Sequence, residues 1–436
     1  MPKTVIIGAG SGFGSRLSVD ILANEALREG AIGLVDINAE RADFVAAYVR
    51  RAVEQHGCKV DVIGGTDRRQ ALPGADFVVT SFHIGGPAYT GKPYYYDIEI
   101  PNTYGLYQTV GDTIGPAGVV RFLRTMPTFA EMLRDIEELA PNARVLNYVN
   151  PMSMLIWAGN EASAVPLVGL CHSVQGTAAQ MAKVLDIPSH ELRYRAAGIN
   201  HMTWYLELRR GNEDVYPQFR EAARANEEFF KLHRVSCELM SHFGYFPAES
   251  SNHHSEYYGY FRKSAATRAH YDLTDGKKVD PDGASPRDAR WRSEETKAIL
   301  SGAKEMDLTA SNEFAATIIN SIVTGVPASA YTNVKNGGLI PNLPPDCVVE
   351  VPTLVDHNGW QPCRIHDLPA QLAALNLTHT SVHRLAVEAW KEASRAKAIE
   401  AILLDPLTAA TLTLDKARAM ANELLDSQPE HLSYLK

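Results

Sequence analysis

The chain has 436 residues, of which 45% are hydrophobic and 21% are charged, as in an ordinary globular protein. Its net charge is −9 without a basic cluster, which makes nucleic acid and anionic membranes poor partners. Its five scattered cysteines form no disulfide framework, and it shows neither a signal peptide nor an apolar run long enough to cross a bilayer. We therefore expect a cytoplasmic protein, and the length favours two domains.

Residues 4–7 predict a buried strand, and a glycine-rich turn follows it. Apolar side chains then recur at helical spacing as far as Leu22, so the order is strand, turn and helix. Such a unit binds a dinucleotide, because its pyrophosphate can sit on the helix N-terminus. The strict pattern G-x-G-x-x-G has its third glycine where this chain has Phe13. The structural alternative is a turn that only packs the helix on the strand. The candidate cofactor-binding residues here are Gly8, Gly10, Ser11, Gly12 and Gly14.

A second predicted strand, residues 31–36, ends in Asp36, about 20 residues beyond the turn. An acid at this point binds the ribose hydroxyls of NAD and repels the 2′-phosphate of NADP. Arg41 lies close enough in sequence to keep NADP as an alternative.

The next elements alternate between helix and strand. A helix is expected over 39–57, and strands over 59–63 and 75–82. This alternation predicts an α/β fold with a doubly wound, mostly parallel sheet, in which ligands bind at the carboxyl ends of strands. Ser81 and His83 are therefore expected near the cofactor.

Residues 87–118 read as a long loop, which is usually functional in a compact domain. A helix over 119–139 and strands over 144–150 and 165–170 follow. We expect an NAD-binding domain over 1–195 and an α+β domain for substrate and metal over 196–436.

The second half no longer alternates simply. Strands are expected over 192–199 and 204–209, and residues 263–307 form a candidate flap or oligomer contact. Residues 318–327 are apolar and buried, and 333–352 are rich in Gly and Pro and contain a short strand. The predicted helical segments are 213–245, 382–404 and 414–425.

Cys171 and His201 each follow a predicted strand and together form a transition-metal pair. Two protein ligands leave coordination positions open for substrate and water, as a catalytic metal requires. From spacing alone, a buried small hydrophobic residue and a hydrogen-bonded core histidine are the simpler interpretations.

Further candidates are polar residues at strand ends and in loops. Asn150, at a strand end, can bind a substrate hydroxyl and a nicotinamide together, or simply begin a turn. Asp112 can bind hydroxyls or transfer protons, although a turn-stabilising role is the commoner one. The segment 251–263 combines polar and aromatic groups, with Glu256 and Tyr257 at its centre, as in a sugar site or a surface cluster.

Five motifs in order make the chain similar to glycoside hydrolase family 4, the NAD- and metal-dependent glycosidases. They are Gly8-Ala-Gly-Ser11, Asn150-Pro-Met152, Gly169-Leu-Cys-His-Ser-Val174, Gly198-Ile-Asn-His-Met202 and Asn342-Leu-Pro344. The resemblance covers nearly the whole chain, and it implies a Rossmann fold related to lactate and malate dehydrogenases. It also implies a homodimer or homotetramer.

The resemblance implies hydrolysis by redox elimination and addition. NAD takes hydride from carbon 3 of the sugar, a base removes the proton on carbon 2, the glycosidic oxygen leaves, water adds and the hydride returns. The metal, manganese(II) or another divalent transition metal, stabilises the enediolate. By carry-over, Cys171 and His201 bind the metal.

The same carry-over gives the other roles. Tyr257 is the candidate base, with its neighbours Glu256 and Tyr258 as alternatives. His172 stands where phospho-glycosidase members have the acid, and it acts as an acid or binds a hydroxyl. Asp112 transfers protons or binds substrate. The expected substrate-binding residues are Asn150, Asn200 and Glu256.

Cys171-His172-Ser173-Val174 resembles the α-galactosidase branch of the family. An α-glucosidase and an α-glucuronidase or α-galacturonidase are the alternatives within the family. Outside it, we consider an NAD-dependent dehydrogenase of sugars or hydroxy acids, and a non-catalytic NAD-sensing protein. Hydroxy-acid dehydrogenases need an arginine where Cys171 and His172 stand, which argues against that substrate class.

Overall fold

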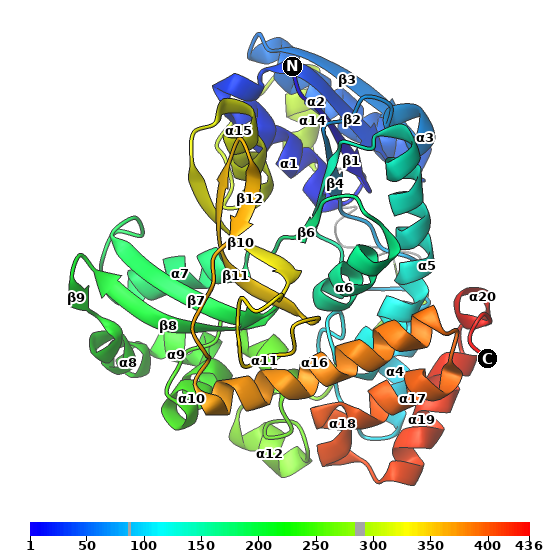
Figure 1. The fold of residues 1–436 in the computed structure, drawn as a ribbon, viewed down its shortest axis with the longest axis vertical. Coiled ribbons are helices and arrows are strands. Elements are labelled where there is room, and N and C mark those ends of the chain that lie inside the picture. The colour runs from blue at the N-terminus through cyan, green and yellow to red at the C-terminus, as the bar shows by residue number, and fades with distance from the viewer. Residues whose placement is uncertain (86–88, 284–292) are drawn as a thin grey trace.

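The computed structural model describes residues 1–85, 89–283 and 293–436 (Figure 1). Within these ranges, the strands form a single 12-stranded sheet in the order β3-β2-β1-β4-β5-β6-β10-β11-β7-β8-β9, with β12 beside β11. Figure 1 shows β1–β4 at one end of the molecule and the C-terminal helices α16–α20 at the other.

The first half of the sheet is parallel. Its strand order, 3-2-1-4-5-6, is that of dinucleotide-binding folds and confirms the doubly wound prediction. The central strands β1 and β4 are buried, apolar and mostly β-branched runs, as in a sheet covered on both faces, whereas the edge strand β3 is largely exposed. The bounds of the parallel strands are β1 (Lys3–Ile7), β2 (Glu29–Val35), β3 (Lys59–Gly65), β4 (Phe77–Thr80), β5 (Arg144–Asn147) and β6 (Leu167–Gly169).

The second half is antiparallel. In it, β10 joins β6 at the pair Asn333 and Gly169, and β11 joins β7 at Glu350 and Gly198. Two late strands thus lie between β6 and β7, and the sheet continues past residue 195, where the domain division stays a prediction. The bounds are β7 (Leu192–Ile199), β8 (Met202–Arg210), β9 (Glu213–Asp214), β10 (Ala328–Lys335), β11 (Val348–Asp356) and β12 (Gly359–Pro362).

Helices cover the sheet and build the lower part of the molecule in Figure 1. In the first half they are α1 (Gly12–Ala23), α2 (Ala39–Gln55), α3 (Arg68–Ala71), α4 (Tyr94–Thr103), α5 (Gly115–Leu139), α6 (Met152–Ala162) and α7 (Ser173–Val184), with a 3₁₀ turn at Glu25–Leu27. Next come α8 (Tyr216–Ala225), α9 (Glu227–Leu232), α10 (Arg234–Phe243), α11 (Ser251–Tyr257), α12 (Ala265–His270), α14 (Glu294–Ser301) and α15 (Phe314–Thr324). The last are α16 (Ala370–Lys391), α17 (Arg395–Leu404), α18 (Pro406–Thr411), α19 (Leu414–Asp426) and α20 (Pro429–Leu432).

Several predicted elements need correction. The expected loop over 87–118 contains α4 and the start of α5, where Pro116 occupies the first turn. Residues 382–404 form parts of two helices, because Ala393 has a positive φ (52°) and ends the first one. The range 333–352 contains the end of β10 and the beginning of β11 rather than one short strand. Part of the expected flap, 284–292, lies outside the described residues, and the rest includes α12 and α14.

Among the described residues, no helix combines the length and the apolar character needed to cross a membrane.

Candidate active site

A cavity of about 830 Å³ lies at the carboxyl ends of the parallel strands. One end is formed by the glycine turn and Asp36, and the other by Cys171 and His201. Of the predicted site residues, the following line it: Gly8, Gly10, Ser11, Gly12, Asp36, Ser81, His83, Asp112, Asn150, Cys171, His172 and His201. The structure therefore joins both predicted sites in one space, as expected of a doubly wound sheet.

The glycine turn leaves no room for side chains. Gly8 has φ +85°, and a Cβ on it would lie 2.3 Å from the carbonyl oxygen of Ser81. A Cβ on Gly10 would lie 2.7 Å from the Asp36 carboxylate. A Cβ on Gly14 would lie 2.0 Å from the Ala9 carbonyl oxygen, so Gly14 lets the helix pack closely on the turn. These glycines let the backbone approach a ligand, as a dinucleotide requires.

Asp36 directly follows β2 and accepts hydrogen bonds from two backbone N–H groups. They come from Gly10 and Asn38, each at 2.9 Å. The carboxylate is thereby held at the cavity wall, and its remaining lone pairs can accept from ribose hydroxyls. Across the turn, the hydroxyls of Ser11 and Ser81 are 2.8 Å apart.

A set of possible metal donors lies at the opposite end of the cavity. His201 Nε2 lies 3.2 Å from Cys171 Sγ and 3.8 Å from a Glu249 carboxylate oxygen. The ligand atoms of these three residues all lie within 4.8 Å of one another, and we call them the donor set. His201 and Glu249 both have positive φ (61° and 114°), a strained backbone that is common at functional sites.

The hydrogen bonds around His201 prepare it as a ligand. The Thr113 hydroxyl donates to Asp112 (2.8 Å), so it accepts from His201 Nδ1, which lies 3.0 Å away. The Tyr257 hydroxyl lies 3.0 Å from the same nitrogen. With its proton on Nδ1, the imidazole turns the lone pair of Nε2 toward Cys171. Burial raises the pKa of the Cys171 thiol to about 12, and a bound cation would reverse this effect.

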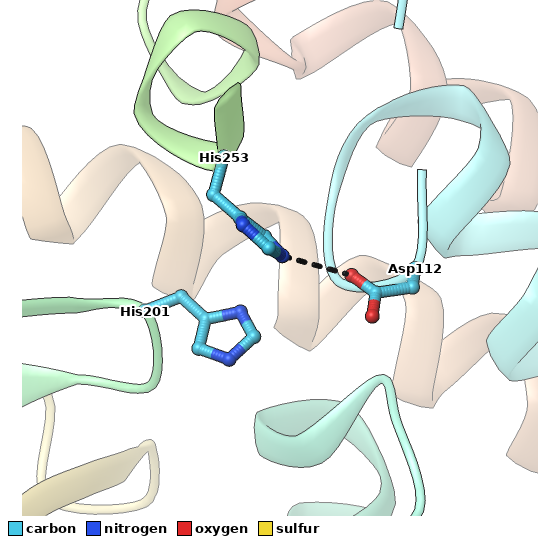
Figure 2. Close-up of side chains that lie close together, drawn as sticks. All are labelled: Asp112, His201 and His253. Atoms are coloured by element: carbon cyan, nitrogen blue, oxygen red, sulfur yellow. Dashed lines mark ion pairs between the residues drawn. The ribbon is translucent and has the colours of Figure 1, made fainter. Parts of the chain in front are cut away.

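Asp112 and His253 extend the site beyond the donor set (Figure 2). His253 comes from α11, and its two nitrogens lie 3.8 Å from Asp112 and 3.1 Å from Glu249. Asp112 accepts from the Tyr89 hydroxyl (2.8 Å) and the Asn150 amide (3.0 Å). Burial alone would raise the pKa of Asp112, but the positive charge of nearby histidines and an arginine lowers it to about 2.

His172 lines the cavity with an exposed side chain, and its Nδ1 lies 3.3 Å from Glu313. The hydrogen bond with Glu313 is the main cause that raises its pKa to about 9.

Four predicted residues do not line the cavity: Gly14, which packs the helix on the turn, and Tyr257, Asn200 and Glu256. Tyr257 contacts His201 from behind, because it bonds to Nδ1 rather than to the Nε2 side that faces Cys171. The Asn200 amide is buried without a hydrogen-bond partner among the described residues. The structure therefore does not bring these side chains to the space where a substrate would lie.

Glu256 has a different structural role. Its fully buried carboxylate accepts the backbone N–H groups of residues 109, 110 and 111, at 2.8, 3.2 and 3.0 Å. It thus fixes the segment that presents Asp112.

Sequence reasoning missed Glu249, His253, Thr113 and Tyr89. His253 lies in the polar and aromatic segment 251–263, which the sequence marks as a candidate sugar site. The composition of this segment does not indicate that His253 contacts Asp112 and Glu249. Glu249 gives no signal, because its carboxylate reaches the site through a positive φ that the sequence does not reveal.

A parallel sheet with a glycine turn, an acid after the second strand and a metal donor set in the same cavity define an α/β protein of the dinucleotide-binding class. Comparison with known families is more specific. The description "Family 4 glycosyl hydrolase" matches residues 3–187, and that of its C-terminal domain matches residues 196–408. The chain belongs to glycosyl hydrolase family 4, as the five motifs predict.

Curated relatives align with the chain over all or nearly all of their length. The α-galactosidase of Bacillus subtilis (strain 168) is 34% identical, and the alignment covers 100% of both chains. The α-galacturonidase of Lachnoclostridium phytofermentans is 28% identical, with 99% of this chain and 96% of the relative covered.

Solved structures confirm the fold. A 6-phospho-α-glucosidase from gut microorganisms, in complex with NAD and Mn²⁺, has a TM-score of 0.82 at 21% identity and covers 100% of both chains. A malate dehydrogenase of Cryptosporidium parvum has a TM-score of 0.54 at 12% identity, covering 90% of this chain and 99% of that one. The predicted similarity of the fold to that of malate dehydrogenase is confirmed.

Proposed function

We propose that the protein hydrolyses α-glycosides, with α-galactosides as the first substrate class, by an NAD- and metal-dependent redox elimination and addition. The observation that carries this proposal is the single cavity joining the dinucleotide turn to the donor set. The α-galactosidase relative supports the galactoside, and the α-galacturonidase relative makes a hexuronide the second candidate.

The residues present fit NAD. The turn at Gly8 and Gly10 leaves no space for a Cβ, and Asp36 is held by backbone N–H groups where a ribose would lie. Its negative charge disfavours a 2′-phosphate. The NAD in the related 6-phospho-α-glucosidase structure agrees with this fit.

The donor set fits a divalent transition metal. A thiolate, an imidazole and a carboxylate within 4.8 Å suit such an ion better than Ca²⁺ or Mg²⁺, which prefer oxygen ligands. We propose Cys171, His201 and Glu249 as its ligands and Mn²⁺ as the metal, as in the related structure.

When bound, NAD supplies a hydride acceptor and the metal supplies positive charge beside sugar oxygens. The protein supplies the proton-transfer groups. His172, whose raised pKa keeps it protonated near neutral pH, is the proposed donor to the leaving oxygen. Asp112 stays ionised and can accept from sugar hydroxyls, and Asn150 holds it from the strand end.

Two tyrosines compete for the role of the base. Tyr257, the predicted base, contacts His201 outside the cavity, whereas Tyr89 lines the cavity with its hydroxyl on Asp112. The position of Tyr89 supports it as the base, with Tyr257 orienting His201. Exchange of the carbon-2 proton of the sugar with deuterated solvent distinguishes them: it should disappear in Tyr89→Phe and persist, more slowly, in Tyr257→Phe. The opposite pattern restores Tyr257.

The decisive experiment follows release of nitrophenol from nitrophenyl α-galactoside and α-galacturonide, with and without NAD, at constant Mn²⁺ and thiol. We expect hydrolysis that requires NAD and leaves no net NADH. The nitrophenyl α-glucoside is measured in the same way. If none of the three substrates is hydrolysed, the proposal is overturned. Stoichiometric NADH with a free sugar indicates a dehydrogenase instead.

A further inference from the structure

Arg121 lies on α5 and lines the cavity near Asp112, although neither the motifs nor the roles above involve it. Its side chain is held on two sides. Nε donates to the Asn150 carbonyl oxygen (3.3 Å), and the guanidinium lies 5.3 Å from the centre of the Tyr89 ring. These contacts fix the guanidinium at the end of the cavity that contains the donor set.

One nitrogen of this guanidinium makes no hydrogen bond to the described residues. Nη1 of Arg121 is buried and has no hydrogen-bond partner among the described residues, although the residue is only 4% exposed. Arg124, one turn further along α5, shows the usual arrangement for a buried arginine, since it donates twice to Asp97 (3.0 and 2.8 Å). A buried, charged donor without an acceptor is unfavourable, and it indicates that a ligand supplies the acceptor.

We propose that Arg121 is a substrate-binding residue whose Nη1 donates to an oxygen of the glycone. This inference rests on the proposed function. Arginine has only donors and a carboxylate has only acceptors. Arg121 and Asp112, on the same wall, thus offer both kinds of partner that sugar hydroxyls use. Its fixed neighbours, Tyr89 and Asn150, both also bond to Asp112, which places Arg121 beside the sugar rather than beside the adenosine.

The acceptor oxygen can come from a hydroxyl of a neutral sugar or from the carboxylate of a hexuronic acid. A planar guanidinium binds a carboxylate in a charge-assisted bond, so the two sources respond differently to the same substitution. Galactose and galacturonic acid are therefore compared as ligands.

The test measures their binding by calorimetry to the protein loaded with NAD and Mn²⁺, and NAD binding separately. In Arg121→Met, we expect the Kd of the recognised sugar to rise at least tenfold while the Kd for NAD stays within twofold. Arg121→Lys keeps the positive charge but loses the planar guanidinium with its several N–H donors, so it should recover part of the sugar affinity. Arg134→Met, an exposed change on the same helix, is the control.

The outcomes separate the possibilities. A larger loss for galacturonic acid than for galactose identifies a carboxylate acceptor, and the reverse identifies a hydroxyl. Unchanged sugar affinity in Arg121→Met, or lost NAD affinity instead, overturns the inference. If the wild type binds a sugar but hydrolyses no α-glycoside, the proposed function fails while the binding test still decides the role of Arg121.

Discussion

Cys171 is the residue on which the donor set depends most directly. Replacing it with serine exchanges a soft thiolate for a hydroxyl, which is a poor ligand for a transition metal. We expect Cys171→Ser to lose at least about 100-fold in kcat, more than the 10–100-fold typical of residues that only support a ligand. NAD binding should stay unchanged, because the dinucleotide turn lies at the other end of the cavity.

The measurement pairs turnover with Mn²⁺ binding, followed by electron paramagnetic resonance. Cys363→Ser is the matched control, since Cys363 is an exposed free cysteine. Wild-type turnover in Cys171→Ser would show that the thiolate is not a ligand.

Glu256 gives a second prediction at this scale, as a positioning residue rather than a substrate ligand. Glutamine keeps its shape but replaces one acceptor oxygen with an NH₂ group, which cannot accept from the backbone N–H groups of 109–111. We expect Glu256→Gln to lower the free energy of unfolding by ~1–3 kcal/mol and to reduce kcat, because Asp112 is displaced. Urea denaturation and steady-state kinetics check both, and an altered KM at full stability would instead favour the direct substrate contact first expected.

The sequence was informative for residues that follow strands and weak for those that reach the site through side-chain networks. Asp36, Ser81, Asn150 and Cys171 were found because the carboxyl ends of parallel strands meet along one edge. The functions of Thr113 and Glu249 depend on hydrogen bonds and a positive φ formed only in the folded protein.

At the scale of elements, α18 carries a pH dependence through its N-cap, Asp405. Its carboxylate accepts from the N–H and hydroxyl of Thr408, yet burial raises its pKa from 3.8 to about 6. The folded state therefore keeps this proton to a higher pH than the unfolded state. The contribution of Asp405 to the free energy of unfolding is therefore fully present below pH 4. It is lost as the pH rises through 6, by ~3 kcal/mol in total.

We expect Asp405→Asn to remove this contribution, because asparagine also caps helices but does not titrate. The variant should be more stable than the wild type at pH 7, and its unfolding midpoint should depend less on pH between 4 and 6. Asp415→Asn, an exposed change in the first turn of α19, is the control. Parallel pH profiles for Asp405→Asn and the wild type would contradict this account.

Periodicity explains which elements could be predicted. The strands β1 to β5 and the helices α2 and α19 have clear apolar patterns, and their positions agree with the structure. Helix α4 was missed because three tyrosines begin it and Pro101 lies inside it, so neither amphipathic spacing nor ordinary helix composition marks it. Tertiary packing against α5 and α19 stabilises it instead.

For the whole molecule, the continuous sheet predicts cooperative unfolding. Because β10 and β11 pair with strands of both halves, neither half keeps a complete sheet alone. We expect one calorimetric transition, which saturating NAD shifts upward as a unit. At 100 times the Kd, NAD should add ~2.7 kcal/mol. Two transitions, of which NAD moves only the first, would show that the halves unfold independently, as a division at residue 195 would allow.

The insertion of β10 and β11 between β6 and β7 also sets an order for biosynthesis. Cys171 and His201 leave the ribosome only 30 residues apart, but the strands that separate and support β6 and β7 come from residues 328–356. A nascent chain released before this point can complete its glycine turn and first parallel strands. It still lacks β10 and β11, the strands that join β6 to β7 and so hold Cys171 and His201 in place. Dinucleotide binding should therefore mature earlier during synthesis than metal binding, and chains truncated before β10 should be unable to hold the metal.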